Sequence, residues 1–186
     1  MDIVSVPNQA LTTPAQAVKS FDKRLVKLID WMKRTLIAAK NPRGVGLAAP
    51  QIGELYRIFI TRPAEKSKIR IFINPEIIKK SDDVTDGLPA QTGVPERENW
   101  LEGCLSIPKI WGRVKRAASV TLRYRDETGK QHEEEFTGFL ATIIQHETDH
   151  VNGVLFTKRV LERKGKLYQP VVTDDGKEIL EEIQLK

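Results

Sequence analysis

The spacing of hydrophobic and polar residues predicts one long helix near the start of the chain. Apolar residues recur at helical intervals over 18–36. Thr13 is a suitable cap for this helix, and Pro14 suits its first position. The sequence Asn-Pro-Arg-Gly at 41–44 disfavours further helix, so we expect the helix to end near Lys40.

Segments rich in β-branched and aromatic residues follow and predict strands. The predicted strands cover 57–61, 69–74 with a continuation over 76–80, 114–115, 119–125, 131–137 and 168–172. Gly129 lies in the short segment before 131–137, which predicts a hairpin there. Residues 81–99 contain few apolar side chains and several glycines, prolines and aspartates, so we expect a long surface loop.

A second helix is expected from Gly138 to about Val151, because Asn152-Gly153 is a helix-ending pair. Its apolar positions continue as histidines: Phe139, Ile143, His146 and His150 follow an i, i+4, i+7, i+11 pattern that should face the core. After it, 178–185 is β-like and ends the chain. The order helix, strands, hairpin, helix, strands predicts the α+β class, with antiparallel sheets.

Composition supports one soluble globular domain. The chain has 186 residues, of which 40% are hydrophobic and 30% charged, so we expect a single catalytic domain over 1–186. No run of 18 apolar residues or signal-like start occurs, and the single cysteine, Cys104, fits a reducing compartment. We therefore expect a cytoplasmic protein without a membrane partner. The net charge of +5 is spread out apart from 158–166, so no direct nucleic-acid site is predicted.

The sequence His146-Glu147-Thr148-Asp149-His150 predicts a metal centre on the second helix. Residues four apart share a helix face, so two imidazoles can bind one metal ion, with Glu147 as general base for the activated water. A catalytic site of this kind takes three protein ligands and leaves one position open. Cys104 is the first candidate for the third ligand.

The segment at 44–53 is dense in glycine and alanine, so its backbone can approach a ligand closely. A phosphate loop is a poor explanation, because the segment lacks the Gly-Lys-Ser/Thr ending. A tight turn between helix and strand would explain the glycines. It would not explain why the amide of Gln51 follows a stretch with almost no side chains.

Three short segments, 44–51, 102–106 and 145–150, resemble the three signature motifs of the peptide deformylases. Those motifs are a glycine-rich segment ending in glutamine, then E-G-C-x-S, then Q-H-E-x-D-H. The resemblance implies antiparallel sheets wrapped around a central helix that carries H-E-x-x-H. It also implies an enzyme that removes the N-formyl group from the formylmethionine of nascent polypeptides and releases formate.

The resemblance also implies a role for each matching residue. The metal ligands would be Cys104, His146 and His150, with Glu147 as catalytic acid and base and with Gln51 and the backbone N–H of Leu105 as oxyanion donors. Glu102 would pair with Arg116 and brace the cysteine loop. The methionine side chain would lie among Val45, Trp100, Phe139, Thr142 and Ile143, and Gly46 would offer its backbone to the peptide. The implied cofactor is one divalent ion, Fe²⁺ first, with Zn²⁺ or Ni²⁺ as alternatives.

The chain departs from the family's pattern in three places. The 81–99 loop is longer than in compact members, and Trp100 and Thr142 stand where aliphatic residues are common. The tail after Phe156 lacks the long basic helix by which some members dock on the ribosome. The sequence therefore leaves open whether this protein makes a transient contact with the ribosome.

The histidine motif is also compatible with two other kinds of metal site. A metallopeptidase of the H-E-x-x-H-x-x-G-x-x-H class would need a histidine where this chain has Phe156. In another class a downstream glutamate is the third ligand, and Glu162 is the nearest, although nothing in the sequence marks it out. A structural metal site would need a fourth ligand, and the spare histidine, His132, is expected to be an exposed strand residue.

Overall fold

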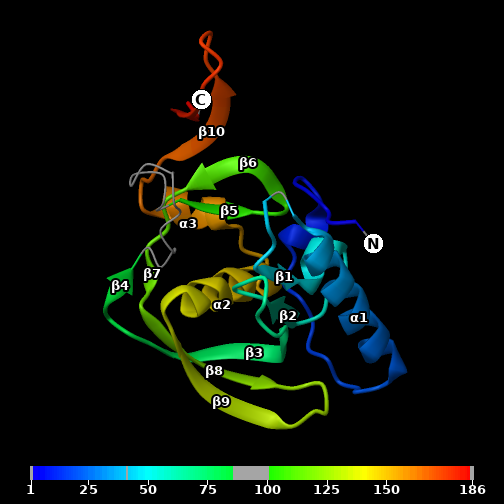
Figure 1. Ribbon diagram of the computed structural model, residues 1–186. Coiled ribbons are helices and arrows are strands. Elements are labelled where there is room, and N and C mark those ends of the chain that lie inside the picture. Colours follow the sequence, from blue (N-terminus) through cyan, green and yellow to red (C-terminus); the bar gives the residue numbers. More distant parts are fainter. Residues whose placement is uncertain (1, 41, 86–100, 185–186) are drawn as a thin grey trace.

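The computed structural model of the protein describes residues 2–40, 42–85 and 101–184 (Figure 1). The helical elements of these residues are η1 (Gln9–Leu11), α1 (Lys23–Ala38), η2 (Ala49–Ile52), α2 (Gly138–Val151) and α3 (Phe156–Glu162). The strands are β1 (Gly46–Ala48), β2 (Ile58–Thr61), β3 (Arg70–Lys80), β4 (Val84–Thr85), β5 (Glu102–Cys104), β6 (Ile107–Gly112), β7 (Arg116–Ala117), β8 (Ser119–Arg125), β9 (Gln131–Thr137), β10 (Leu167–Val172) and β11 (Glu178–Glu182).

The strands form three sheets in which every described pair is antiparallel. One sheet has the order β1-β2-β3-β8-β9, a second has the order β11-β10-β6-β5, and β4 pairs with β7. In Figure 1, α2 lies between the five-stranded sheet and the four-stranded sheet. The predicted α+β class is therefore confirmed.

The α2 helix packs its apolar side into the core of the five-stranded sheet. Ile144 is fully buried in a cluster with Phe59, Phe72 and Leu122. Burying one such side chain stabilises the fold by roughly 1.5–3 kcal/mol. Because this packing fixes the helix in the protein interior, the side chains on its other faces are held in fixed positions as well.

Both ends of α2 lie where the sequence predicted them. The helix begins at Gly138, directly after β9, and Gly138 has a φ of +59° that other residues rarely adopt. It ends before Gly153, which has a φ of +70°. A Cβ atom on Gly153 would lie 2.8 Å from the carbonyl oxygen of Thr12, so a side chain at this position would collide with the neighbouring backbone.

The predicted start of the first helix is wrong. The helix begins at Lys23, not Pro14, and the side chain of Asp22 accepts hydrogen bonds from the backbone N–H groups of its first turn. The preceding residues bond to distant segments instead: Ala15 N–H donates to Val151, and Val18 N–H donates to the Asn74 side chain. Tertiary hydrogen bonds therefore replace the helical ones over 15–18.

Two further expectations need correction, and one lies outside the described residues. The predicted strand at 114–115 is absent from the described structure, where β6 and β7 lie on either side of it. Residues 156–162 form a helix that was not predicted; Phe156 and Val160 are one turn apart on it and are buried in one cluster with Cys104. Of the predicted 81–99 loop, only 81–85 is described, with β4 within it.

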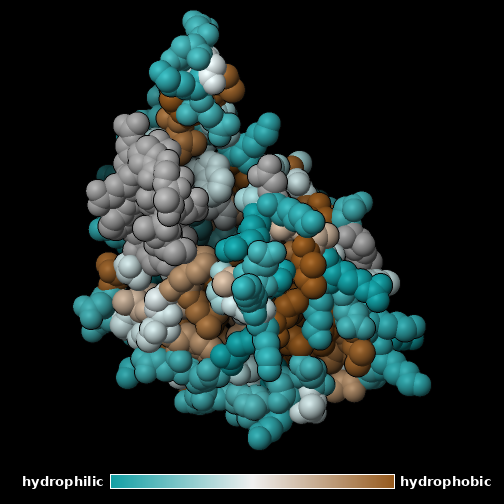
Figure 2. All heavy atoms as spheres, in the orientation of Figure 1, coloured by the Kyte–Doolittle hydropathy of each residue, from teal (hydrophilic) through white to brown (hydrophobic). Residues whose placement is uncertain are grey.

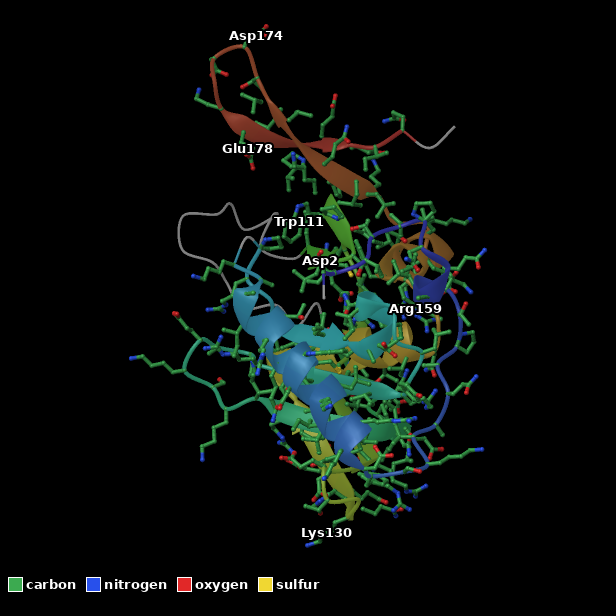
Figure 3. All side chains as sticks on the ribbon, turned by 90° about the vertical axis from the view of Figure 1, so that its right-hand side faces the viewer. Asp2, Trp111, Lys130, Arg159, Asp174 and Glu178 are labelled. Carbon is green, nitrogen blue, oxygen red and sulfur yellow. The ribbon has the colours of Figure 1, made fainter. Side chains whose placement is uncertain are left out.

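The last strands, β10 and β11, form a hairpin that projects from the rest of the molecule (Figure 1), and Asp174 lies at its tip (Figure 3). The hairpin is continuous with the four-stranded sheet, because Leu167 pairs with Gly112 of β6. Polar residues cover the tip of this hairpin and also the β8–β9 hairpin at the other end of the molecule (Figure 2). None of the described helices is both long enough and apolar enough to span a lipid bilayer.

Candidate metal centre and active site

Three potential metal-ligand atoms converge between α2 and β5. The Nε2 atom of His150 lies 3.2 Å from Cys104 Sγ and 3.1 Å from His146 Nε2. All three atoms lie within 4.8 Å of one another. Zn–N bonds of about 2.0–2.1 Å and Zn–S bonds of about 2.3 Å place tetrahedral ligand atoms roughly 3.3–3.7 Å apart. The two separations from His150 are close to this range, and the three side chains together could hold one divalent cation.

Local structure explains why Cys104 faces the helix. It is the last residue of β5, where the register with β6 shifts between Gly103 and Cys104. Gly103 lies opposite Trp111, and a Cβ atom on Gly103 would lie 2.7 Å from the Trp111 ring. The glycine therefore lets the aromatic ring pack across β5 and leaves the cysteine directed toward α2.

A buried chain of charged groups orients one of the histidines. Glu102 Oε1 lies 2.6 Å from Nδ1 of His146 and accepts a second hydrogen bond from Arg116, which donates twice to the Glu102 carboxylate. Arg116 also donates to Asp149 at 2.9 Å. A carboxylate on the second nitrogen of a metal-binding imidazole fixes the ring and raises its basicity. Glu102 and Arg116 thus meet as the sequence led us to expect.

These neighbours also set the charges of the centre in the metal-free protein. Burial alone would raise the pKa of Glu102, but Arg116 and His146 hold that pKa well below its usual range. Burial alone would also raise the pKa of the Cys104 thiol, whereas His150 and His146 beside it hold it well below its usual range. A thiolate is the form of cysteine that binds metals, so the site favours a cation.

Glu147 lies beside the three ligand atoms and is almost completely buried, with an exposed fraction of 3%. Its Oε2 atom has no hydrogen-bond partner among the described residues. Burial raises the pKa of Glu147 to about 7, although His146 and His150 oppose the rise. A carboxylate whose pKa lies near neutral pH can both accept and return a proton at that pH.

The amide of Gln51 lies beside Cys104 in a fixed orientation. Its Oε1 atom accepts a hydrogen bond of 2.8 Å from Ala48 N–H. Its Nε2 group therefore faces Cys104 Sγ at 3.6 Å and Ser106 Oγ at 3.3 Å. The Gln51 side chain is 1% exposed. The amide that stood out in the sequence is therefore a buried donor next to Cys104.

A cavity of about 720 Å³ opens onto these groups. It is lined by most of the residues that the sequence proposed for substrate binding, namely Val45, Gly46, Phe139, Thr142 and Ile143, together with Gln51, Leu105 and Glu147. Trp100 lies outside the described residues. The structure adds lining residues that the sequence analysis missed, namely Lys40, Arg43, Leu101 and Trp111.

One of these missed residues left a signal in the sequence. Trp111 can occupy its position because Gly103 lies opposite it. The signal in the sequence is the glycine itself, since glycine within a strand often marks a close approach by another group. The third histidine lies on a strand away from the metal group, as expected, but it is only partly exposed: His132 Nε2 is 2.6 Å from Asp126 Oδ2 on the β8–β9 hairpin.

An α+β fold whose H-E-x-x-H helix joins two imidazoles to a thiolate, with a buried carboxylate beside them, is typical of hydrolytic metalloenzymes. The family model for polypeptide deformylase matches residues 1–166. The chain therefore belongs to the peptide deformylase family, as its three motifs indicated.

Individual relatives agree with this assignment. Peptide deformylase 1 of Bacillus subtilis (strain 168) is 42% identical over 158 residues, which cover 85% of this chain and 88% of the relative. The peptide deformylase of Borreliella burgdorferi is 35% identical over 177 residues, covering 95% and 98% of the two chains.

Solved structures show the same fold. A class I type b peptide deformylase from Acinetobacter baumannii, in a crystal structure with K3U bound, has a TM-score of 0.72 at 33% identity, covering 86% of this chain and 98% of that one. A peptide deformylase from Synechococcus elongatus in complex with actinonin has a TM-score of 0.72 at 34% identity, covering 85% and 77%.

Proposed function

We propose that the protein is a metal-dependent hydrolase that removes the N-formyl group from the formylmethionine of nascent polypeptides and releases formate. One observation carries this proposal most directly. Cys104, His146 and His150 converge beside Glu147 at the end of a cavity, in a chain of the peptide deformylase family. The alternative of a metallopeptidase with a glutamate ligand is not favoured, because Glu162 is exposed and lies outside the metal group.

In the proposed mechanism, Cys104, His146 and His150 would hold the ion. When bound, a divalent cation lowers the pKa of water and polarises a carbonyl oxygen. Glu147 takes the proton of the attacking water on its carboxylate and later returns it to the nitrogen of the leaving amine. Its raised pKa, about 7, suits both transfers near neutral pH.

The tetrahedral intermediate of formyl hydrolysis carries a negative oxygen that needs fixed donors. Gln51 Nε2 is one, because Ala48 holds the other end of the amide and leaves the NH₂ group facing the cysteine. The backbone N–H of Leu105 is the second proposed donor, next in the chain to Cys104 and on the same cavity. Donors held rigidly before the reaction do not have to reorganise as charge develops.

The cavity gives a physical basis for binding a methionine side chain. Val45, Phe139 and Ile143 supply apolar surface, and Trp111 adds an aromatic ring from β6. Thr142 also lines the cavity, and its Oγ1 atom has no partner among the described residues. We assign the peptide backbone of the substrate to the edge of β1 at Gly46, where a main chain can approach closely.

The remaining assignments follow from the resemblance and complete the proposal. Fe²⁺ is the ion we propose, with Zn²⁺ or Ni²⁺ as alternatives, because one thiolate and two imidazoles suit all three. Residues 1–186 would form one catalytic domain. The protein would act in the cytoplasm, in N-terminal methionine excision. Its partners would be nascent formylmethionyl peptides, with transient ribosome contact.

Product analysis tests this function against the peptidase alternative. The purified protein, loaded with Fe²⁺ or Ni²⁺ without oxygen, is incubated with a formylated methionyl peptide and with the same peptide carrying an N-acetyl group. We expect formate and an otherwise intact peptide from the formylated substrate alone. Cleavage within either peptide chain would instead indicate a metallopeptidase.

A further inference from the structure

A second cavity, of about 640 Å³, lies against a different face of α2. It is enclosed by β3, β4, β7, α2 and α3. The α2 residues on it are Gln145, Thr148 and Asp149, and Asn152 follows directly after the helix. It shares no described lining residue with the substrate cavity. Its volume falls within the range of small-ligand sites, about 300–1,000 Å³.

Positive charge dominates the lining of this cavity. Six cationic side chains face three carboxylates; the cations are Arg57, Lys80, Lys115, Arg116, Arg159 and Arg163, and the carboxylates are Glu76, Asp149 and Glu162. Lys80, Lys115 and Arg163 are exposed, and their side chains form no ion pair or hydrogen bond with the rest of the described chain. The less exposed arginines, Arg57, Arg116 and Arg159, already bond to protein groups. The charge without a partner among the described residues therefore lies on the three exposed side chains.

A buried hydroxyl in the same cavity also lacks a partner. Thr148 lines the cavity at an exposed fraction of only 7%, and its Oγ1 atom has no hydrogen-bond partner among the described residues. A buried polar group left unpaired destabilises a fold. In this conformation the hydroxyl is closed off from the cavity, so the exposed cations and not this atom carry the site.

We propose that this cavity is a second ligand site, one that binds a pyrophosphate group, either free or as part of a nucleoside diphosphate. Phosphate oxygens accept charge-assisted hydrogen bonds from guanidinium and ammonium groups, and both kinds of donor are present. Two linked phosphates carry enough charge to engage Lys115 and Arg163 together. A carboxylate ligand would supply less charge for the same set of cations.

The site is connected to the metal centre by direct contacts between charged groups. Arg159, labelled in Figure 3, lines the cavity and donates to Asp149 at 2.7 Å. Asp149 accepts from Arg116, and Arg116 donates to Glu102, the carboxylate on His146 Nδ1. An anion that draws Arg159 away from Asp149 changes the charge balance around Arg116. This coupling, unlike the binding site itself, rests on the proposed metal site.

Calorimetric titration with pyrophosphate at fixed ionic strength tests the site. We expect the wild-type protein to bind one equivalent and the K115A/R163A variant to bind at least about tenfold more weakly, since the variant lacks two charge-assisted hydrogen bonds to the anion. Both replaced side chains are exposed, so the fold should persist. ADP is titrated in parallel: tighter binding of ADP than of pyrophosphate identifies a nucleotide site, and equal or weaker binding of ADP identifies a site for the free anion.

The matched control is K27A/K33A, which removes the same charge from α1 and leaves the cavity unchanged. It should bind pyrophosphate like the wild type. Equal binding by the wild type and both variants would overturn the proposal. Binding would then come from the net charge of the protein or from chelation of its metal, and not from this cavity. Absence of binding to the wild type would overturn it as well.

A separate measurement tests the coupling between the pyrophosphate site and the metal centre. Binding is reciprocal between linked sites, so the pyrophosphate affinity of the wild type should differ between metal-loaded and metal-free protein, by roughly fivefold or more. R159A, which removes the link, should abolish the difference. Equal affinities in the two wild-type forms would refute the coupling while leaving the binding site intact.

Discussion

A Cβ atom on Gly46 would lie 2.8 Å from the carboxylate carbon of Glu147 and 2.9 Å from its Cγ. Strand β1 therefore passes directly against the side chain to which we assign the proton transfers. Glu147 is buried at this contact, and its Oε2 atom has no other partner among the described residues. The glycine is thus needed for the position of the carboxylate as much as for the approach of substrate.

Replacing Gly46 by alanine should move the Glu147 carboxylate and lower kcat/KM about 10²-fold, a typical effect of misplacing a catalytic group by about 1 Å. The variant should stay folded, because the colliding atoms belong to a side chain and not to the backbone. Steady-state kinetics and thermal unfolding measure the two effects.

A double-mutant cycle separates this effect from general damage to β1. In an E147Q background, G46A should reduce the residual activity little further, because the group it displaces no longer transfers protons. Fully additive losses would mean that Gly46 acts independently of Glu147.

Gln51 and Leu105 should respond differently to side-chain removal. Q51A deletes the proposed donor and should lower kcat about 10²–10³-fold, as expected for loss of one oxyanion donor. L105A keeps its backbone N–H, so its effect on kcat should be smaller. Kinetics of the two variants under identical metal loading provide the comparison, and a larger loss in L105A would contradict the assignment.

The stability of the metal-free protein should depend on the ionisation of Glu147. Burial raises its pKa from 4.5 to about 7, so between these pH values the folded state holds a proton that the unfolded state has lost. The contribution is fully present below pH 4.5 and disappears as the pH rises to about 7, a change of about 3 kcal/mol.

Urea unfolding of the metal-free wild type and E147Q across this range measures the effect. Only the wild type should lose this stability with rising pH, because glutamine does not titrate. Parallel pH profiles of the two proteins would show that Glu147 is not held protonated by the fold.

Metal binding should depend on Cys104, His146 and His150, and not on the remaining histidine, His132. C104A and H150A should each lose the metal, because a catalytic site of this type has three protein ligands and no spare one. H132A is the control: His132 pairs with Asp126 and lies outside the metal group, so its removal should leave the metal content unchanged. Metal analysis of the purified variants decides between these outcomes.

Local sequence signals were sufficient to predict the limits of α2, the β8–β9 hairpin and the three proposed metal ligands. The limits of α2 could be predicted because Gly138 and Gly153 mark them, and the β8–β9 hairpin because Gly129 marks its turn. The likeness of three short motifs to a known family pointed to Cys104, far from the histidines in sequence, as their partner. The structure then brought the three ligand atoms within 4.8 Å of one another.

The errors arose where tertiary contacts outweigh local ones. The backbone over 15–18 bonds to Val151 and Asn74, which no helical periodicity could reveal. The α3 helix spans only two turns, and its buried pair of Phe156 and Val160 is too short a pattern to distinguish from a strand. The clash that makes Gly46 necessary depends on a residue about a hundred positions away.

Formate release tests the central claim most directly. The purified protein, loaded with Fe²⁺ or Ni²⁺ in the absence of oxygen, should release formate from a formyl-Met-Ala peptide. E147Q should keep its metal and lose activity by about 10²–10⁴-fold, because only the proton transfer is removed. Absence of formate from the fully metal-loaded wild type, or undiminished release by metal-loaded E147Q, would contradict the account.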